Sequence, residues 1–487
     1  MPSSFYDVIV LGNDLAGLIA ATLCARRGLR VLVIDAGAAP PERYDVPPYS
    51  LPRTAQTFVG ESSPAVRRVV AELNFIQLVR RKLSVYRPSF QVVLPDARIE
   101  VSADADALGH ELQRELPDEK VALEAAFARA ADVSRVLEPV LGQDVSFPPD
   151  GFWEKREIAR SDSRLPSPDD DLLPGVPEGH RARALLALPA AFSLPLDPRA
   201  RSPVAALRAF DLWRRGAARM EGGVEALRAM LVEKLRTQHA GEVRTARWKA
   251  ISSKWGRAQG VVLGEREELV GAQQVICALP AGEIAALLGD KPPRRVAQAE
   301  RGLKPTAHRM TLNVVLAGTG VPEGISPVTF VVVDPAAPLL GDNAFALHLG
   351  EPDDDNRVVL TVVANVAAEP DGLAAAMSEL RPRLLERLEE ILPFSREHIL
   401  LAHAPQLEDP TAAPAEPLYT STLPSALGVG ALPYDLGLRG LVSASAQNLL
   451  GLGVEGAFAA GWSAARIVSH AAGKKKDYLK DEVLLGG

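Results

Sequence analysis

The first 35 residues constrain the fold more than any other stretch of this chain. Residues 8–11 form a continuous apolar run, as expected for a parallel strand that is buried on both faces. Apolar residues then recur at helical spacing from Leu15 to Leu23, and a second apolar run, Val31–Ile34, ends at Asp35. This order of strand, helix, strand and terminal acid is the fingerprint of a βαβ unit that binds a dinucleotide.

Two glycines and one acid in this unit indicate what it can hold. Gly12 allows the tight turn out of the first strand, and Gly17 allows the helix and the strand to approach closely. Asp35 stands where a carboxylate accepts hydrogen bonds from a ribose 2′-hydroxyl, which favours FAD or NAD over a 2′-phosphate.

Asp14 stands where the fingerprint has its second glycine, the one that lets the backbone approach the pyrophosphate. If the Asp14 carboxylate points toward the cofactor, it repels the phosphates. If it caps the helix N-terminus, it occupies the anion position itself. The sequence leaves both arrangements open.

Length and composition bound the remaining possibilities. A chain of 487 residues exceeds one ordinary hydrophobic core, so two domains are expected. A hydrophobic content of 47% with 24% charged residues is typical of a soluble globular protein. The net charge of −7 argues against nucleic-acid binding. No signal peptide or membrane-spanning run is visible, so we expect a cytoplasmic protein with at most peripheral membrane contact.

Several other residues could carry chemistry, and each has a simpler interpretation. Cys24 and Cys277 lie in apolar segments and are expected to be reduced core residues. The consecutive acids of Asp169–Asp171 point in different directions, which favours a solvated loop over a metal site. None of the eight histidines has the spacing of a triad or a metal site, so we predict no metal and assign no catalytic residue.

The aromatic residues Phe192, Phe210 and Trp213 recur along a helical segment. Such spacing is more typical of core packing than of a lipophilic substrate pocket, although the second interpretation stays open.

The rest of the chain is predicted to alternate between helices and strands. Loops are expected at residues 36–53 and 144–177. Predicted helices cover residues 62–83, 103–141 (as two helices), 181–218, 224–235, 282–288, 373–392 and 457–470. Predicted strands cover residues 90–94, 99–101, 275–280, 310–316, 329–334, 345–349, 358–366 and 440–446, with a small antiparallel meander at 242–251, 258–263 and 268–270.

With these blocks in place, the chain resembles the FAD-dependent phytoene desaturase and amine oxidase superfamily over nearly its whole length. The pattern after Asn74 and the strands around Asn313 and Asp334 look like the carotenoid desaturase branch. The main carriers of the resemblance are the N-terminal βαβ unit, the Gly222-Gly223 turn with its helix, the strand at 275–280 and the block from Gly440 to Ile467.

The resemblance implies an α/β protein with a Rossmann-type FAD/NAD(P)-binding domain, consisting of a parallel sheet, helices and a small β-meander, plus an inserted α+β substrate domain. FAD would lie with its adenine end at the N-terminal strands and its isoalloxazine ring between the domains, where a small lipophilic, possibly isoprenoid, substrate gives up hydride. The implied ranges are 1–88, 220–290 and 430–475 for the FAD-binding domain, 89–219 and 291–429 for the substrate or cap domain, and 476–487 for a flexible tail.

The resemblance also carries an FAD site over to this chain, although the sequence departs from the family pattern at several places. Trp248 aligns with a valine whose backbone contacts adenine, and Ser445-Ala446 aligns with a Gly-Asp pair whose acid binds the ribityl-phosphate region. Residues 36–41 lack the usual glycine pair and basic residue. The implied cofactor-binding residues are Gly12, Asp14, Leu15, Ala16, Gly17, Asp35, Trp248, Ala446, Gly453 and Val454.

Two hypotheses follow. The first is an FAD-dependent oxidoreductase that acts on a lipophilic substrate. The second is a desaturase-like protein that binds flavin weakly or not at all and serves as a binding or scaffold module. Asp14 and Ala446 discriminate between them, because bound FAD would clash with the first and lack a partner at the second. The retained glycines, together with Asp35, favour the enzyme.

Overall fold

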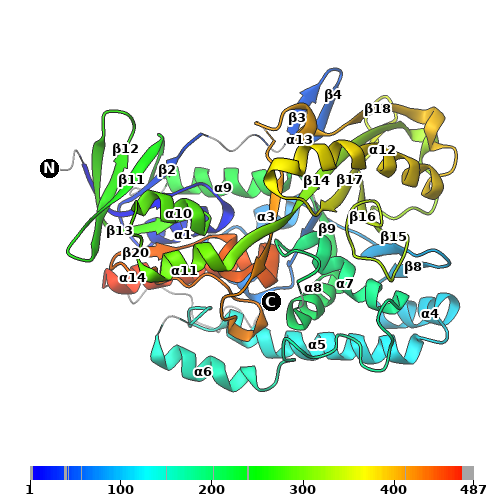
Figure 1. The fold of residues 1–487 in the computed structure, drawn as a ribbon, viewed down its shortest axis with the longest axis horizontal. Coiled ribbons are helices and arrows are strands. Elements are labelled where there is room, and N and C mark those ends of the chain that lie inside the picture. The colour runs from blue at the N-terminus through cyan, green and yellow to red at the C-terminus, as the bar shows by residue number, and fades with distance from the viewer. Residues whose placement is uncertain are drawn as a thin grey trace.

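The computed structural model describes residues 4–37, 41, 43–55, 57–149, 151–200, 202–237, 241–411 and 413–473. Residues 38–40 of the predicted loop and the predicted tail at 476–487 lie outside these ranges. Two large sheets organise the molecule and lie side by side in Figure 1.

The first sheet has seven strands in the order β10-β2-β1-β13-β12-β11, with β20 paired to β13. The strands β10, β2, β1, β13 and β20 run parallel, whereas β11 and β12 continue from β13 as an antiparallel meander. Its strands are β1 (Ser4–Leu11), β2 (Val31–Asp35), β10 (Gly241–Thr245), β11 (Trp248–Lys254), β12 (Arg257–Leu263), β13 (Glu268–Cys277) and β20 (Leu441–Ser443).

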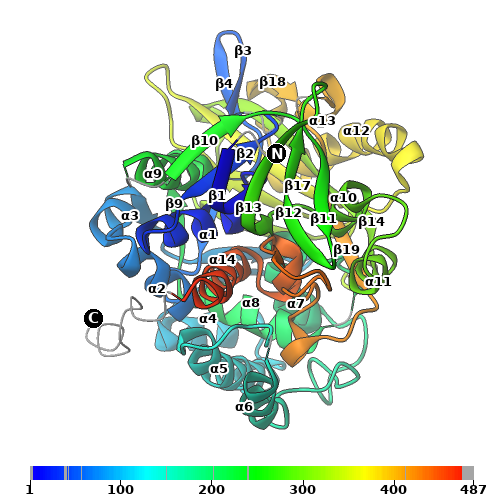
Figure 2. The same cartoon turned by 90° about the vertical axis from the view of Figure 1, so that its left-hand side faces the viewer.

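Alternation along β1 explains how this sheet is covered. Val8 and Val10 belong to a core with the helices on one face, and Ile9 and Leu11 belong to a core with those on the other. The first face carries α1 (Leu15–Arg26), α2 (Pro64–Glu72), α3 (Ile76–Lys82), α9 (Gly223–Thr237) and α14 (Gly453–Ala471), and the second carries α10 (Ala281–Leu288) and α11 (Arg294–Gly302). Figure 2 shows α14 and α1 lying along the same side of the sheet.

The second sheet has eight strands in the order β18-β14-β17-β16-β15-β7-β8, with β19 paired to β14. One face packs on α12 (Leu373–Ile391), and the other packs on a group of helices from the middle of the chain. The strands are β7 (Phe90–Val93), β8 (Arg98–Val101), β14 (Leu303–Ala317), β15 (Val328–Val332), β16 (Ala344–Leu349), β17 (Arg357–Val366), β18 (Ile399–His403) and β19 (Glu416–Ser421), and the helices are α4 (Ala105–Glu115), α5 (Lys120–Gly142), α6 (Phe152–Asp162), α7 (Arg181–Ser193), α8 (Pro203–Arg215) and α13 (Pro405–Glu408).

The predicted fold class, a Rossmann-type α/β domain with a second sheet-containing domain, is confirmed. The segments that form the first sheet come from three separate parts of the chain. The division at residues 88, 219, 290 and 429 stays a prediction.

Besides the helix predicted at 181–218, which is divided into α7 and α8, four predicted elements were wrong in detail. Residues 36–53 contain a hairpin, β3 (Arg43–Val46) with β4 (Tyr49–Pro52), which Figure 1 shows projecting beside β18. The segment 144–177 contains α6, which begins after Gly151 with Glu154 bonded back to the Gly151 N–H. The helix at 62–83 is divided at Asn74, whose φ is +57°.

The meander was the fourth. Residues 241–245 pair in parallel with β2 and do not belong to the meander. The prediction failed because alternation of side chains does not determine strand direction. Residues 268–277 form one continuous strand that pairs with β1 along its length. A small third sheet was also missed, in which β9 (Ala217–Met220) lies between β5 (Thr57–Val59) and β6 (Leu83–Val85).

Both cysteines are buried and free, as predicted. Asp171 lies in a loop, where its carboxylate pairs with Arg183, and this ion pair holds the pKa of Asp171 down at about 2. Among the described residues, no helix is both long and apolar enough to cross a membrane.

Candidate functional site

The carboxyl ends of β1, β13 and β20 meet at one edge of the first sheet, because these strands are parallel. Ala278, which follows β13, packs against the loop that leaves β1. A Cβ at Gly12, whose φ is +95°, would lie 2.6 Å from the Ala278 carbonyl oxygen, and a Cβ at Gly17 would lie 2.4 Å from the Ala278 Cβ. The packing of the apoprotein alone therefore requires both glycines.

Asp14 caps the α1 helix and fills its anion position. The Asp14 Oδ1 accepts a hydrogen bond of 2.7 Å from the Gly17 N–H, and the Ala446 N–H also donates to this carboxylate. Burial raises the pKa of Asp14 to about 7, while these two hydrogen bonds and the nearby charge of Arg228 act in the opposite direction. A carboxylate of the protein thus stands where the fingerprint places a pyrophosphate.

The raised pKa of Asp14 predicts a stability that depends on pH. The unfolded chain loses this proton near pH 3.8, whereas the folded chain keeps it up to about pH 7. Between these values the folded state binds more protons, so its stability falls as the pH rises. We expect the free energy of unfolding of the wild type to fall relative to Asp14→Asn from about pH 4 to about pH 7, as measured by urea denaturation. Asp171→Asn is the control, because its lowered pKa places its titration below this window.

Asp35 lies at the end of β2, as predicted for a ribose-binding acid, but it already has partners. Its Oδ2 accepts from the Asn13 side-chain amide at 2.8 Å, and its Oδ1 accepts from the Gly37 N–H at 2.9 Å. The Ala246 N–H donates to the Asp35 carbonyl oxygen at 2.9 Å, which brings the start of β11 and its half-buried Trp248 near this end of the sheet.

Leu15 and Ala16 form the first turn of α1 and are buried. A Cβ at Gly461 of α14 would lie 2.5 Å from the Ala16 carbonyl oxygen, so the two helices cross there in close contact. Leu15 and Ala16 therefore position the N-terminus of α1 against α14.

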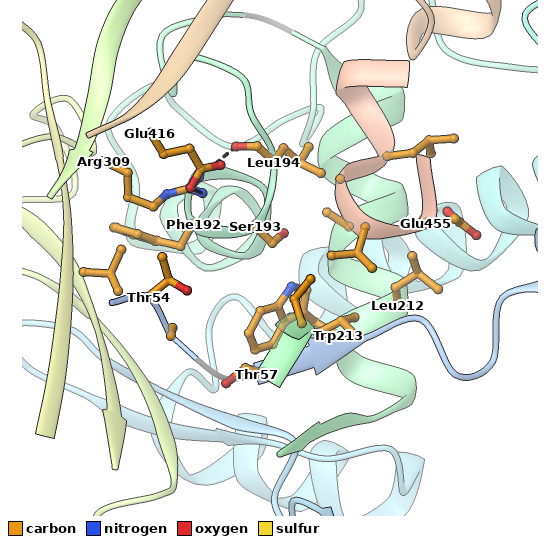
Figure 3. Close-up of a pocket in the computed structure, with 18 of the residues that line it drawn as sticks. Thr54, Thr57, Phe192, Ser193, Leu194, Leu212, Trp213, Arg309, Glu416 and Glu455 are labelled. Atoms are coloured by element: carbon orange, nitrogen blue, oxygen red, sulfur yellow. Dashed lines mark hydrogen bonds and ion pairs between the residues drawn. The ribbon is translucent and has the colours of Figure 1, made fainter. Parts of the chain in front are cut away.

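Gly453 and Val454 begin α14, four residues before the predicted start, and they line a cavity of about 280 Å³ between the second sheet and the start of α14. A Cβ at Gly453 would lie 2.7 Å from the Ser193 carbonyl oxygen, so the end of α7 comes close to this turn. Figure 3 shows the cavity with Thr54 and Thr57 on one side and Ser193 and Leu194 on another. The other residues predicted to bind the cofactor are not among the described residues that line it.

Two ion pairs line this cavity, and the first of them is buried. The fully buried Arg208 of α8 holds Glu455 of α14 with contacts of 3.0 Å from Nε and 2.5 Å from Nη2, and it also contacts Glu138 at 2.9 Å. Burial opposes the charge on Arg208, but these two carboxylates outweigh it and raise its pKa above the ordinary value. Arg309 of β14 pairs with Glu416 at 2.8 Å. The charges of the two pairs balance.

His348 of β16 is the titratable ring in the cavity wall. Its Nδ1 lies 2.8 Å from the Thr57 hydroxyl oxygen. Burial, and then the charge of Arg309, lower the pKa of His348 to about 4, so the imidazole is neutral at neutral pH. A base of such low pKa is poorly matched to proton abstraction at neutral pH, and we assign it no catalytic role.

The aromatic residues of α7 and α8 have both of the roles weighed from the sequence. Phe210 is fully buried and belongs to the core alone, whereas Phe192 and Trp213 pack in the same core and also line the cavity. The interpretation as core residues was therefore incomplete for two of the three.

A larger cavity, of about 700 Å³, opens on the other side of α7. It is lined by alanines of α7 and α8 and by the loop at residues 335–339, and its rim includes Asp171 and Asp197. Both carboxylates are held by arginines, and none of the predicted cofactor residues lines this cavity.

The structure therefore brings the predicted residues together in two groups. Gly12, Asp14, Gly17 and Ala446 meet at the α1 N-terminus, with Asp35 linked to them through Asn13, whereas Gly453 and Val454 lie at the cavity. Sequence reasoning missed the cavity residues Arg208, Arg309 and His348. Alternation marked their strands and helices, but no local signal indicated which face would line a cavity.

The residues fit FAD at one end only. The turn at Gly453 and Val454 presents the start of a helix to the cavity beside the second sheet, which is a suitable place for a redox ring. At the other end, the Asp14 carboxylate holds the amides that a pyrophosphate would need. As they stand, the residues of the pyrophosphate end do not fit the cofactor.

Comparisons with known proteins support the fold. Residues 10–73 match the model of an NAD(P)-binding Rossmann-like domain. No protein of curated function matches the chain by sequence. Similar solved structures include a putrescine oxidase variant (17% identity, TM-score 0.62, 96% of this chain and 99% of that one) and cyclohexylamine oxidase from Brevibacterium oxydans (16%, 0.62, 96% and 99%). An oxidoreductase from Methanosarcina mazei is similar at 14% identity and a TM-score of 0.59, over 94% and 99% of the two chains.

Proposed function

We propose that this protein is an FAD-dependent oxidoreductase that acts on a small lipophilic substrate in the cavity between its second sheet and the start of α14. The observation that carries the proposal is the position of that cavity at the start of α14, where Gly453 and Val454 end the turn that follows β20. When bound, FAD would supply hydride transfer. The named oxidases with a similar fold support the same class of reaction, while a carotenoid desaturase-like specificity rests on the sequence resemblance.

The roles of the protein residues follow from their contacts. The buried pair of Arg208 and Glu455 holds α8 against the start of α14, and thereby fixes the wall of the cavity. Phe192, Leu212 and Val363 provide apolar surface that excludes water from it.

A second candidate is a protein that binds flavin weakly or not at all and serves as a binding module. The capping contact of Asp14 favours it, because this carboxylate competes with the cofactor phosphates for the same amides. In that case the glycines of the fingerprint persist for packing.

The visible spectrum of the purified protein tests both candidates. We expect flavin absorbance that survives desalting, either directly or after incubation with excess FAD, together with a rise of the melting temperature on addition of FAD. Protein that stays colourless and whose melting temperature does not respond to FAD would contradict the first candidate and favour the second. NAD and NADP, added in parallel, show whether another dinucleotide is preferred.

A further inference from the structure

The indole nitrogen of Trp213 is a buried hydrogen-bond donor whose position the protein fixes firmly. The Trp213 side chain is 3% exposed, and its ring packs edge-on against Phe90 and Phe330 at centroid distances of 5.9 and 5.2 Å. Its Nε1 has no acceptor among the described residues. Buried donors of this kind are normally paired, so this N–H calls for a partner.

The cavity lies on the side where that partner can stand. Trp213 lines the cavity, and Figure 3 shows the nitrogen edge of its indole directed into it from the helix side. Across the cavity, the Nε of Arg309 also lacks an acceptor, while its other two nitrogens are held by Glu416 and by the Leu194 carbonyl oxygen, each at 2.8 Å. Two residues of this cavity, from two different elements, thus each have a buried donor without an acceptor among the described residues.

The acids of the cavity are already engaged. Glu455 is held through both oxygens by Arg208, and Glu416, whose side chain is 46% exposed, is held through its Oε2 by Arg309, so each described carboxylate already has a counter-ion. Because the charges of these pairs cancel, an additional ionic group in this buried space would lack a counter-ion. The cavity therefore favours a neutral ligand that accepts a hydrogen bond.

We propose that this cavity takes a neutral, apolar molecule with a carbonyl oxygen, which accepts a hydrogen bond from the Trp213 indole N–H, while Phe192, Leu212 and Val363 contact its hydrocarbon part. The inference rests on the proposed function only in treating the cavity as the substrate site. The proposed ligand class, a neutral carbonyl compound, differs from the amines for which the oxidases among its structural neighbours are named.

The test uses three probes with the same hydrocarbon chain, namely 2-octanone, octylamine and octanoate, added to the full-length protein with and without FAD. The protein carries ¹⁵N-labelled tryptophan, and its indole N–H signals are followed by NMR. The variant Trp213→Phe identifies the Trp213 signal, because that signal is then missing from the spectrum, and the phenylalanine keeps an aromatic ring in the core. Trp255→Phe is the matched control, because Trp255 is 85% exposed.

We expect 2-octanone to shift the Trp213 signal and to bind about five- to tenfold more weakly to Trp213→Phe, as for the loss of one hydrogen bond. Trp255→Phe should bind it like the wild type. Should Trp213→Phe not fold, the Trp213 signal in the wild type is assigned by elimination from the variants Trp153→Phe, Trp248→Phe, Trp255→Phe and Trp462→Phe, and its shift still tests the proposal.

Three results would overturn the inference. Octylamine or octanoate could bind more tightly than 2-octanone, which would contradict the neutral ligand. FAD alone could move the Trp213 signal while 2-octanone does not, which would assign the donor to the cofactor. Finally, the Trp213 signal could stay unchanged with all three probes. Binding of the probes is measured by NMR and does not depend on flavin absorbance. A failure of the protein to bind FAD is therefore distinguished from a failure to bind 2-octanone.

Discussion

Replacing Arg208 by Met is expected to lower the free energy of unfolding by about 3–5 kcal/mol, the usual cost of breaking a buried ion pair by removing one partner. Arg208 is fully buried and Glu455 is 1% exposed, so the change leaves an unpaired carboxylate at the start of α14. The pair joins residues 247 apart in sequence and connects helices that pack on different sheets. Urea denaturation measures the loss.

The double variant Arg208→Met with Glu455→Met separates charge from packing. It should recover much of the stability, because neither member of the pair leaves an unpaired buried charge and Glu138 keeps its contact of 2.5 Å with Arg215. Arg135→Met, in an exposed pair with Asp132, is the control and should change stability little. A loss at Arg208→Met no larger than at Arg135→Met would mean that the buried pair does not hold the cavity wall.

Asp14→Gly is expected to raise the affinity for FAD by about tenfold to a hundredfold. The change removes a carboxylate that holds the Gly17 and Ala446 amides and would stand close to two phosphates. Loss of the helix cap should cost only a few tenths of a kcal/mol when Gly replaces Asp. Titration followed by flavin fluorescence measures the affinity.

Asp14→Asn is the matched control, since it keeps the size of the side chain and a capping oxygen but removes the charge. If charge is the obstacle, this variant gains most of the affinity of Asp14→Gly. Wild-type affinity should then rise as the pH falls below about 7, because Asp14 becomes protonated, while Asp14→Asn shows no such change. Equal affinity of all three proteins would show that Asp14 is not the obstacle.

Local sequence patterns predicted the frame of this protein well. The apolar runs before Gly12 and Asp35 became neighbouring parallel strands, with α1 between them in the chain. The four strands predicted between residues 310 and 366 became members of one sheet, as β14, β15, β16 and β17. The sequence patterns failed at β10, because alternation does not determine strand direction. They also failed at the hairpin β3–β4, because its strands are short and carry few apolar residues.

By itself, the sequence determined the Rossmann-type unit and the need for Gly12 and Gly17, because both follow from local order and close packing. It also identified Asp14 as the residue on which function depends, but left two positions open for its carboxylate. Only the tertiary structure decided between them, because the Ala446 amide and the Arg228 charge come from distant segments. The same holds for the cavity, whose donors and ion pairs come from strands and helices far apart in the chain.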